Sequence, residues 1–239
     1  MKIYNKHFHG QMSDHFRTAL FIILSGGFQD AYTYISRGGV FANAQTGNIV
    51  LMSSAMFDGD ASKIFKYLIP VVSFILGIAT AEVVHMHFKH YEKIHWRQMI
   101  LFSEIILLFV VGFLPHRVDY LANALVSYVC ALQVQTFHKI RGHAYASTMC
   151  IGNMRSGTEA LCVYYHTHDK EVLKKALTYF SVILVFAVGA GIGSFITKIA
   201  GDKSIWICCV LLSISFGICT GKRIKGVFEN GQDSGLRCI

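Results

Sequence analysis

Two polar segments of this chain carry the side chains best suited to bind a small solute. They lie in the otherwise apolar stretches 39–57 and 144–165, and each has a Gly-Asn pair near its middle. Their candidate binding residues are Asn43, Gln45, Thr46, Gly47, Asn48, Gly152, Asn153 and Arg155. The amides and the hydroxyl offer uncharged donors and acceptors, and an arginine fork suits a carboxylate or phosphate. Two alternatives remain open: helix-to-helix hydrogen bonding by the amides, and an ion pair of Arg155 with Glu159 one helical turn later.

Three further polar side chains, those of Asp30, Glu104 and Gln133, lie inside apolar windows. An ionisable group at membrane depth is costly unless it is paired, hydrated or protonated, so a functional role is the default explanation. We predict that Asp30 is the central acid of a binding site, that Gln133 contributes to it, and that Asp30 and Glu104 are candidates for proton coupling. The alternatives are a structural carboxylate bound to the backbone near Gly47 for Asp30, an interfacial position for Glu104, and helix-to-helix bonding for Gln133.

The sequence contains no motif typical of an enzyme, a metal site or a cofactor site. HExxH, the phosphate-binding P-loop and the dinucleotide fingerprint do not occur in it. Histidines cluster at His85, His87, His90 and His95, but their spacing matches no common ligand set. We therefore predict a protein that is not an enzyme and that uses no metal and no cofactor.

The elements that position these residues must be membrane helices. Of the 239 residues, 53% are hydrophobic and only 15% are charged, whereas a soluble domain carries about 25% charged residues. A membrane-spanning helix needs about 20 mostly apolar residues. Six windows meet or approach that length, over residues 17–36, 67–87, 96–114, 120–137, 177–199 and 204–221. We predict an all-α, polytopic transmembrane bundle of about six spanning helices, with the two Gly-Asn segments forming re-entrant or broken helices.

The net charge of +8, from 22 Lys and Arg against 14 Asp and Glu, indicates orientation in the membrane rather than a nucleic-acid partner. With six spans and the N-terminus inside, most of the basic residues fall in inner loops, as the positive-inside rule requires. An eight-span alternative, in which both Gly-Asn segments cross, places fewer of them inside and buries Arg155. Both versions describe one membrane domain (1–239) with cytoplasmic tails at 1–16 and 222–239.

The order of features repeats in the two halves of the chain, 17–114 and 120–221. In each half a Gly-Asn segment precedes an apolar window with Phe-x-x-Gly, at Phe74 and at Phe186, and then a window with a Trp at or near its start, Trp96 and Trp206. Three spans per half is an odd number, so the second half would enter the membrane upside down, as in transporters built from inverted repeats. The two broken segments would then approach the midplane from opposite sides and line a protein or water-filled interior. Chance similarity between apolar sequences is the alternative.

A run of five residues, followed by an aromatic residue and a Thr-Gly-Asn triplet, resembles the signature of the YoaK family of small bacterial inner-membrane proteins. The matching residues are Gly27, Phe28, Gln29, Asp30, Ala31, Phe41, Thr46, Gly47 and Asn48. Gly77 and Gln133 also fall where that family has matching residues, so the resemblance covers nearly the whole chain. One departure is Ile151, which stands before Gly152 where the family often has a threonine. The resemblance implies a polytopic protein of the bacterial inner membrane with a domain of unknown function, and no established substrate.

Polar residues inside repeated, interrupted membrane segments favour a transporter. We predict a small-solute permease with a central polar site, embedded in the lipid bilayer and without a nucleic-acid partner; a homo-oligomer remains open. The rival hypothesis is a non-transporting membrane protein, either a lipid-binding or sensory module or a subunit of a larger assembly.

Overall fold

The structure is a computed structural model that describes residues 16–89, 96–140, 143–144 and 150–235. The α-helices are α1 (Phe16–Ser36), α2 (Gln45–Phe57), α3 (Ala61–Phe88), α4 (Trp96–Val111), α5 (Asp119–Thr136), α6 (Cys150–Thr167), α7 (Lys170–Ala200) and α8 (Trp206–Gly235). Two short 3-10 helices, η2 (His116–Val118) and η3 (Gly201–Ile205), precede α5 and α8. A two-residue antiparallel pair, β1 (Lys139–Ile140) and β2 (His143–Ala144), follows α5. The all-α prediction is confirmed.

Each of the six apolar windows of the sequence coincides with a helix: α1, α3, α4, α5, α7 and α8. Among the described residues, two helical stretches are long and apolar enough to cross a membrane by length and composition. They are Ala61–Phe88, with a mean hydropathy of 2.0, and Lys170–Thr220, with a mean hydropathy of 2.1. The second stretch contains α7, η3 and part of α8, and the chain reverses direction at Gly201, whose positive φ of 59° favours glycine.

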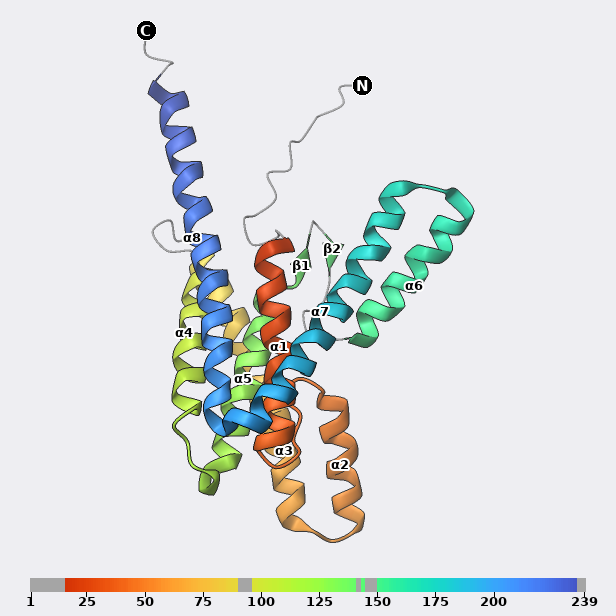
Figure 1. Cartoon of the computed structure of the whole chain (residues 1–239), viewed down its shortest axis with the longest axis vertical. Coiled ribbons are helices and arrows are strands. Elements are labelled where there is room, and N and C mark those ends of the chain that lie inside the picture. The colour runs from red at the N-terminus through yellow and green to blue at the C-terminus, as the bar shows by residue number, and fades with distance from the viewer. Residues whose placement is uncertain (1–15, 90–95, 141–142, 145–149, 236–239) are drawn as a thin grey trace.

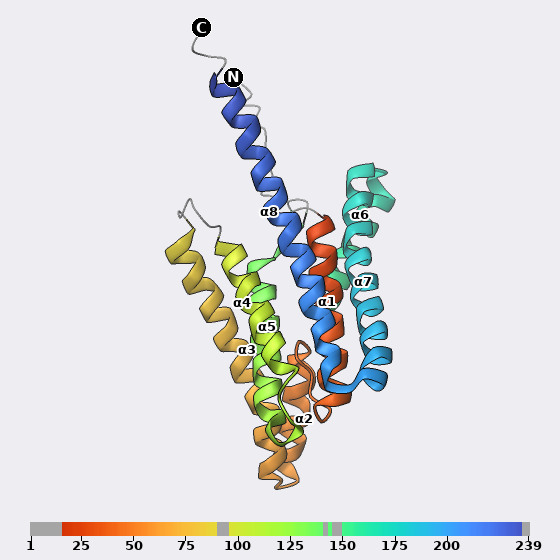
Figure 2. The same cartoon turned by 60° about the vertical axis from the view of Figure 1, so that its left-hand side comes forward.

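Six of the helices pack in two layers (Figure 2). In one layer α3 and α4 pack against α5, and in the other α7 and α8 pack against α1. Contact between α4 and α8 joins the layers, and the main buried cluster lies between them, with residues such as Phe28, Leu108 and Val126. Helix α2 packs on α3 at one end of the bundle, and α6 packs on α7 toward the other end (Figure 1).

Glycines permit the two closest helix crossings. A Cβ at Gly189 of α7 would overlap the carbonyl oxygen of Leu24 on α1, and a Cβ at Gly77 of α3 would lie 2.6 Å from the carbonyl oxygen of Tyr128 on α5. Gly191 lies two residues after Gly189, and a Cβ there would have no atom within 4 Å. Close packing against α1 therefore explains Gly189 and Gly193 of α7, and Gly191 has no such contact.

The Gly-Asn pairs do not interrupt helices in the way the sequence suggested. Gly47 and Asn48 lie in the first turn of α2, after the non-helical loop 37–44, and Gly152 and Asn153 lie in the first turn of α6. Both helices then continue without a break. The N–H groups of the first turn have no partner within the helix in any case, so a glycine there disrupts no helical hydrogen bond. The break in the first segment comes before the Gly-Asn pair, and residues 145–149 before the second pair lie outside the described residues.

Candidate functional site

Asp30 connects α1 to the loop that precedes α2. Its Oδ1 accepts the backbone N–H of Asn43 at 2.9 Å, and Nδ2 of Asn43 donates to the carbonyl oxygen of Gly26 at 3.1 Å. The Oδ1 atom of Asn43 is buried and has no hydrogen-bond partner. Asp30 itself is only partly buried, so this carboxylate and the spare Asn43 oxygen form a polar site at the edge of the core. The same contacts fit the structural alternative, since Asp30 holds the loop backbone.

Asn48 holds the loop at Phe41. Its Oδ1 accepts the N–H of Phe41 at 3.1 Å, and its Nδ2 donates to the carbonyl oxygen of Phe41 at 2.7 Å and to Oε1 of Gln45 at 3.0 Å. A Cβ at Gly47 would lie 3.0 Å from the Phe41 ring, so glycine gives this ring its space. The amide of Asn48 is thus used within the protein, whereas Thr46 is exposed at the start of α2. Gln45 also donates to the carbonyl oxygen of Ala42 at 2.8 Å.

The start of α6 also lies near Asp30. Helices α2 and α6 begin near the middle of the molecule and run toward opposite ends (Figure 1). Cys150, the first residue of α6, lies within electrostatic range of Asp30. The amino-terminal ends of both helices carry partial positive charge, which favours a nearby anionic group such as the Asp30 carboxylate. Within the described residues Asp30 forms no ion pair with a lysine, arginine or histidine.

The second polar segment is only partly brought to this site. Asn153 is 2% exposed, whereas Gly152 is exposed. Arg155 and Glu159 are both exposed, and no ion pair joins them among the described contacts. Arg155 therefore lies on the outer side of α6 rather than at the Asp30 site.

A line of buried polar groups leads from Asp30 into the core. Nε2 of Gln29 donates to Oγ of Ser25 at 2.9 Å, and Sγ of Cys130 donates to Oε1 of Gln29 at 3.0 Å. Cys130 lies within electrostatic range of both Asp30 and Glu104. Gln29 and Cys130 were not singled out as site residues in the sequence, although Gln29 stands next to Asp30 in the family signature.

Arg37, which follows α1, is the second feature that the sequence did not indicate. Its side chain is fully buried; Nη1 lies 2.9 Å from Oδ1 of Asp119, and Nη2 lies 3.7 Å from Oδ2 of Asp202. Nε donates to the hydroxyl of Tyr32 at 2.9 Å, and Nη2 donates to the carbonyl oxygen of Val111 at 3.3 Å. Burial opposes the charge, but the interactions with Asp119, Tyr32 and Asp202 together outweigh it and raise the pKa of the Arg37 guanidinium. Arg37 thus joins α1 to the starts of α5 and η3.

The Arg37 cluster borders a polar pocket of about 220 Å³, which also contacts Lys66, His116, Tyr120 and Asn123. The two ring nitrogens of His116 lie 3.3 Å from Asp119 and 3.2 Å from Asp202. Asn123 donates to the carbonyl oxygen of Arg37 at 2.9 Å. The pocket and its ion pairs close the end of the bundle where α1 ends and α5 begins.

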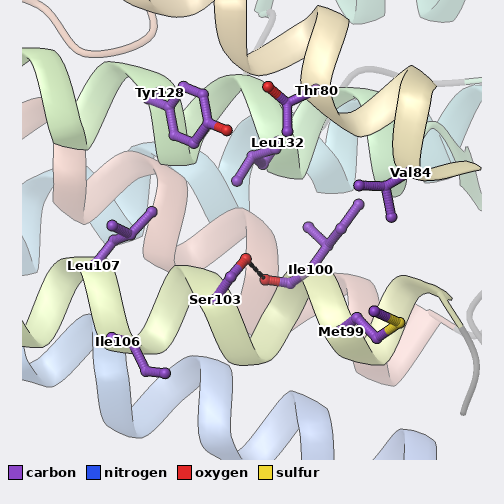
Figure 3. Close-up of a pocket in the computed structure, with 9 residues that line it drawn as sticks. All are labelled: Thr80, Val84, Met99, Ile100, Ser103, Ile106, Leu107, Tyr128 and Leu132. Atoms are coloured by element: carbon purple, nitrogen blue, oxygen red, sulfur yellow. Dashed lines mark hydrogen bonds between the residues drawn. The ribbon is translucent and has the colours of Figure 1, made fainter.

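An apolar groove of about 480 Å³ lies between α3, α4 and α5 (Figure 3). Its lining residues are Thr80, Val84, Met99, Ile100, Ser103, Ile106, Leu107, Tyr128 and Leu132. The Ser103 hydroxyl donates to the carbonyl oxygen of Ile100 within its own helix at 2.7 Å. The groove is therefore suited to a hydrocarbon chain rather than a polar solute.

No three His, Cys, Asp or Glu side chains come together as metal ligands would within the ranges that the structure describes. His85 lies at the end of α3, 3.6 Å from the carboxylate of Glu82. His90 and His95 lie outside the described residues.

Comparison with known proteins agrees with the membrane assignment. Residues 18–218 match the family described as "Protein of unknown function (DUF1275)". The chain is 25% identical over 216 residues to a protein of Bacillus subtilis (strain 168) described as "UPF0700 transmembrane protein YoaK", and the match covers 85% of this chain and 92% of that protein. No solved structure matches the chain significantly. The resemblance seen in the sequence is confirmed.

Proposed function

This chain belongs to the DUF1275 family and is a membrane protein, and from that premise we propose that it is a permease for a small polar solute. The observation that carries the proposal is the Asp30 site, where the loop before α2 binds one carboxylate, the first residue of α6 lies within electrostatic range of it, and Oδ1 of Asn43 is unpaired. Helix ends that meet inside a membrane protein are a common way to build a solute site. In this proposal Asp30 and Asn43 contact the solute, with Gln45, Thr46 and Asn153 around them.

The other predicted site residues have narrower parts in the proposal. Gly47 and Asn48 shape the loop, Gly152 keeps the start of α6 open, and Gln133 extends the polar line into the core. Arg155 would contact only a solute that is leaving or entering along α6. Asp30 and Glu104 are the acids available for proton coupling, and the protein has no enzymatic role.

The proposed topology has six spans, formed by α1, α3, α4, α5, α7 and α8. Helices α2 and α6 enter part of the membrane from opposite sides, and the chain is a single domain of the bacterial inner membrane with both termini in the cytoplasm. In support of this arrangement, the α6–α7 turn lies toward the same end of the bundle as the end of α8, and the α2–α3 turn lies at the opposite end (Figure 1). A helix of 13 residues, such as α2, is about 20 Å long and too short to span.

We also propose that the two halves are inverted repeats, with α1 to α4 equivalent to α5 to α8. If each helix is replaced by its equivalent in the other half, every main packed pair corresponds to another packed pair. The α1–α7 pair corresponds to α5–α3, and the α2–α3 pair corresponds to α6–α7. The glycine crossings match in the same way, since Gly77 meets the carbonyl of Tyr128 and Gly189 meets that of Leu24. Gln133 and Gln29 then occupy equivalent positions, because Gln133 lies five residues after Tyr128 and Gln29 lies five residues after Leu24.

Replacement of Asp30 tests the function directly. In proteoliposomes, a screen of radiolabelled small solutes is expected to find one whose uptake falls at least tenfold with Asp30→Asn, because a neutral amide cannot supply the charge of the site. The control is Asp58→Asn, in the exposed turn after α2, which should leave uptake unchanged. Equal uptake by the wild type and Asp30→Asn would remove Asp30 from the mechanism.

Labelling of single cysteines tests the topology. In a background without native cysteines, a membrane-impermeant thiol reagent applied to intact cells from outside should label Asp58→Cys, between α2 and α3. It should not label Thr167→Cys, at the end of α6, until the membrane is opened. Labelling of both sites from the same side contradicts the inverted arrangement.

The apolar groove favours a second candidate function, a non-transporting lipid-binding protein. A groove of hydrocarbon-lined walls at the depth of the bilayer can hold an acyl chain, and a sensory or accessory subunit would use it to respond to lipid. This candidate predicts no flux for any solute and a lipid that co-purifies in fixed ratio and is lost with Ser103→Trp, which fills the groove.

A further inference from the structure

One buried pair of side chains remains unexplained by the solute site: Glu104 on α4 and Gln133 on α5. Both are 0% exposed, and the Gln133 amide is the polar group that interacts with the Glu104 carboxyl. Neither oxygen of Glu104 has a hydrogen-bond partner, and neither the nitrogen nor the oxygen of the Gln133 amide has one. A buried polar atom in this state has lost its bonds to water and gained none in the protein, which destabilises the fold. The pair is therefore destabilising in this arrangement, and we expect another state in which all four atoms form hydrogen bonds.

The equivalent glutamine in the other half shows that burial alone does not leave an amide unpaired. Gln29 is also 0% exposed, but its Nε2 donates to Ser25 and its Oε1 accepts from Cys130. The α5 helix supplies Gln133 with no such fixed partners, and what it faces instead is an acid. The difference between the two halves thus lies in Glu104.

Among the described residues, no lysine, arginine or histidine contacts the Glu104 carboxyl. The titratable groups that the structure places near Glu104 are Cys130 on α5, which is in electrostatic range of both Glu104 and Asp30, and Cys209 on α8, whose Sγ donates to the carbonyl oxygen of Ile105. Arg97 lies on the same face of α4 but two helical turns away, about 10 Å along the axis. Within the described structure Glu104 forms no ion pair. An ionised carboxylate in such a place lacks both counter-charge and water.

We infer that Glu104 and Gln133 form a proton-binding acid–amide pair. A protonated carboxyl has one O–H donor and a carbonyl acceptor, and a primary amide has two N–H donors and a carbonyl acceptor. The O–H of Glu104 can donate to Oε1 of Gln133 while Nε2 of Gln133 donates to the carbonyl oxygen of Glu104, which satisfies all four atoms. Loss of the proton removes one of these bonds and places a carboxylate oxygen against the amide oxygen, so the pair opens.

The inference deepens the proposed function by naming the proton as the coupling ion and this pair as its carrier. It rests on that function only for the coupling, because the proton can be detected without any flux. The proton comes from water at either membrane face and returns to it, and no other co-reactant is needed.

Infrared difference spectroscopy of the purified full-length protein in lipid tests the pair. At neutral pH the wild type should show the carbonyl band of a hydrogen-bonded, protonated carboxylic acid, shifted when H₂O is replaced by D₂O. The band should disappear with Glu104→Gln, move to higher wavenumber with Gln133→Leu because the hydrogen bond is lost, and stay unchanged with Glu82→Gln and Asp30→Asn. Glu82, which accepts from Gln135 at 2.7 Å and is partly exposed, is the matched control.

Thermal unfolding of the same variants shows whether a lost band reflects the missing carboxyl group or a misfolded protein. Glu104→Gln is nearly isosteric with the protonated acid, so its midpoint should lie within about 3 °C of the wild type, a difference of about 1 kcal/mol. A wild-type spectrum with no band sensitive to Glu104→Gln overturns the inference, and so does a band that Gln133→Leu leaves in place. Neither result depends on whether a transported solute has been found.

Discussion

Gly189→Leu will prevent stable folding, whereas Gly191→Leu, two residues along the same helix, will be tolerated. At Gly189 even the first side-chain carbon would overlap the carbonyl oxygen of Leu24, so α1 and α7 would have to separate along their largest contact. Overpacking that cannot be relieved by a rotamer change costs about 3 kcal/mol or more. Gly191 is exposed with nothing within 4 Å, and replacement of a mid-helix glycine there should add about 0.5–1 kcal/mol of stability.

The measurement is the fraction of protein that elutes as a single species after detergent extraction, together with its midpoint of thermal unfolding. Gly77→Leu should behave like Gly189→Leu, because it faces the carbonyl of Tyr128 at the equivalent crossing of α3 and α5. If Gly189→Leu elutes and unfolds like Gly191→Leu, the close approach of α1 and α7 is wrong. If only one of the two crossings is sensitive, the packing of the halves is not equivalent.

The secondary structure of this protein follows from its hydrophobic pattern. All six apolar windows are helices, and Trp96 and Trp206 begin α4 and α8. Length and polarity alone identify such segments, because a membrane or a buried core leaves the backbone no alternative to internal hydrogen bonds.

The site was less predictable, because an amide in a sequence looks the same whether it is free or bonded. Asn43 and Asn48 lie five residues apart, yet Asn43 keeps an unpaired oxygen while Asn48 is fully used on Phe41. Only the path of the loop decides which is available to a solute. The partners of Arg37 could not be predicted from the sequence for a different reason. Asp119 and Asp202 are distant from it in the chain, and no local pattern connects them to the end of α1.

Arg37→Met will destabilise the protein by about 3 kcal/mol, which corresponds to a fall of about 6–12 °C in the midpoint of thermal unfolding. The methionine fills similar volume but leaves Asp119 and Asp202 without their shared cation and Tyr32 without its donor. The two aspartates are about a quarter exposed, so water relieves part of the loss. Arg117→Met, at an exposed arginine in the neighbouring η2, is the control and should change the midpoint by less than about 2 °C.

The planar fork of Arg37, and not its charge alone, is expected to matter. Three nitrogens of this side chain contact Asp119, Asp202, Tyr32 and Val111 at once, which a lysine ammonium on a single stem cannot reproduce. Arg37→Lys should therefore recover less than half of the stability lost in Arg37→Met, measured in the same detergent and at the same pH. Full recovery by lysine would show that a point charge near Asp119 suffices, and an Arg37→Met midpoint equal to that of Arg117→Met would show that the cluster does not hold the starts of α5 and η3 to the end of α1.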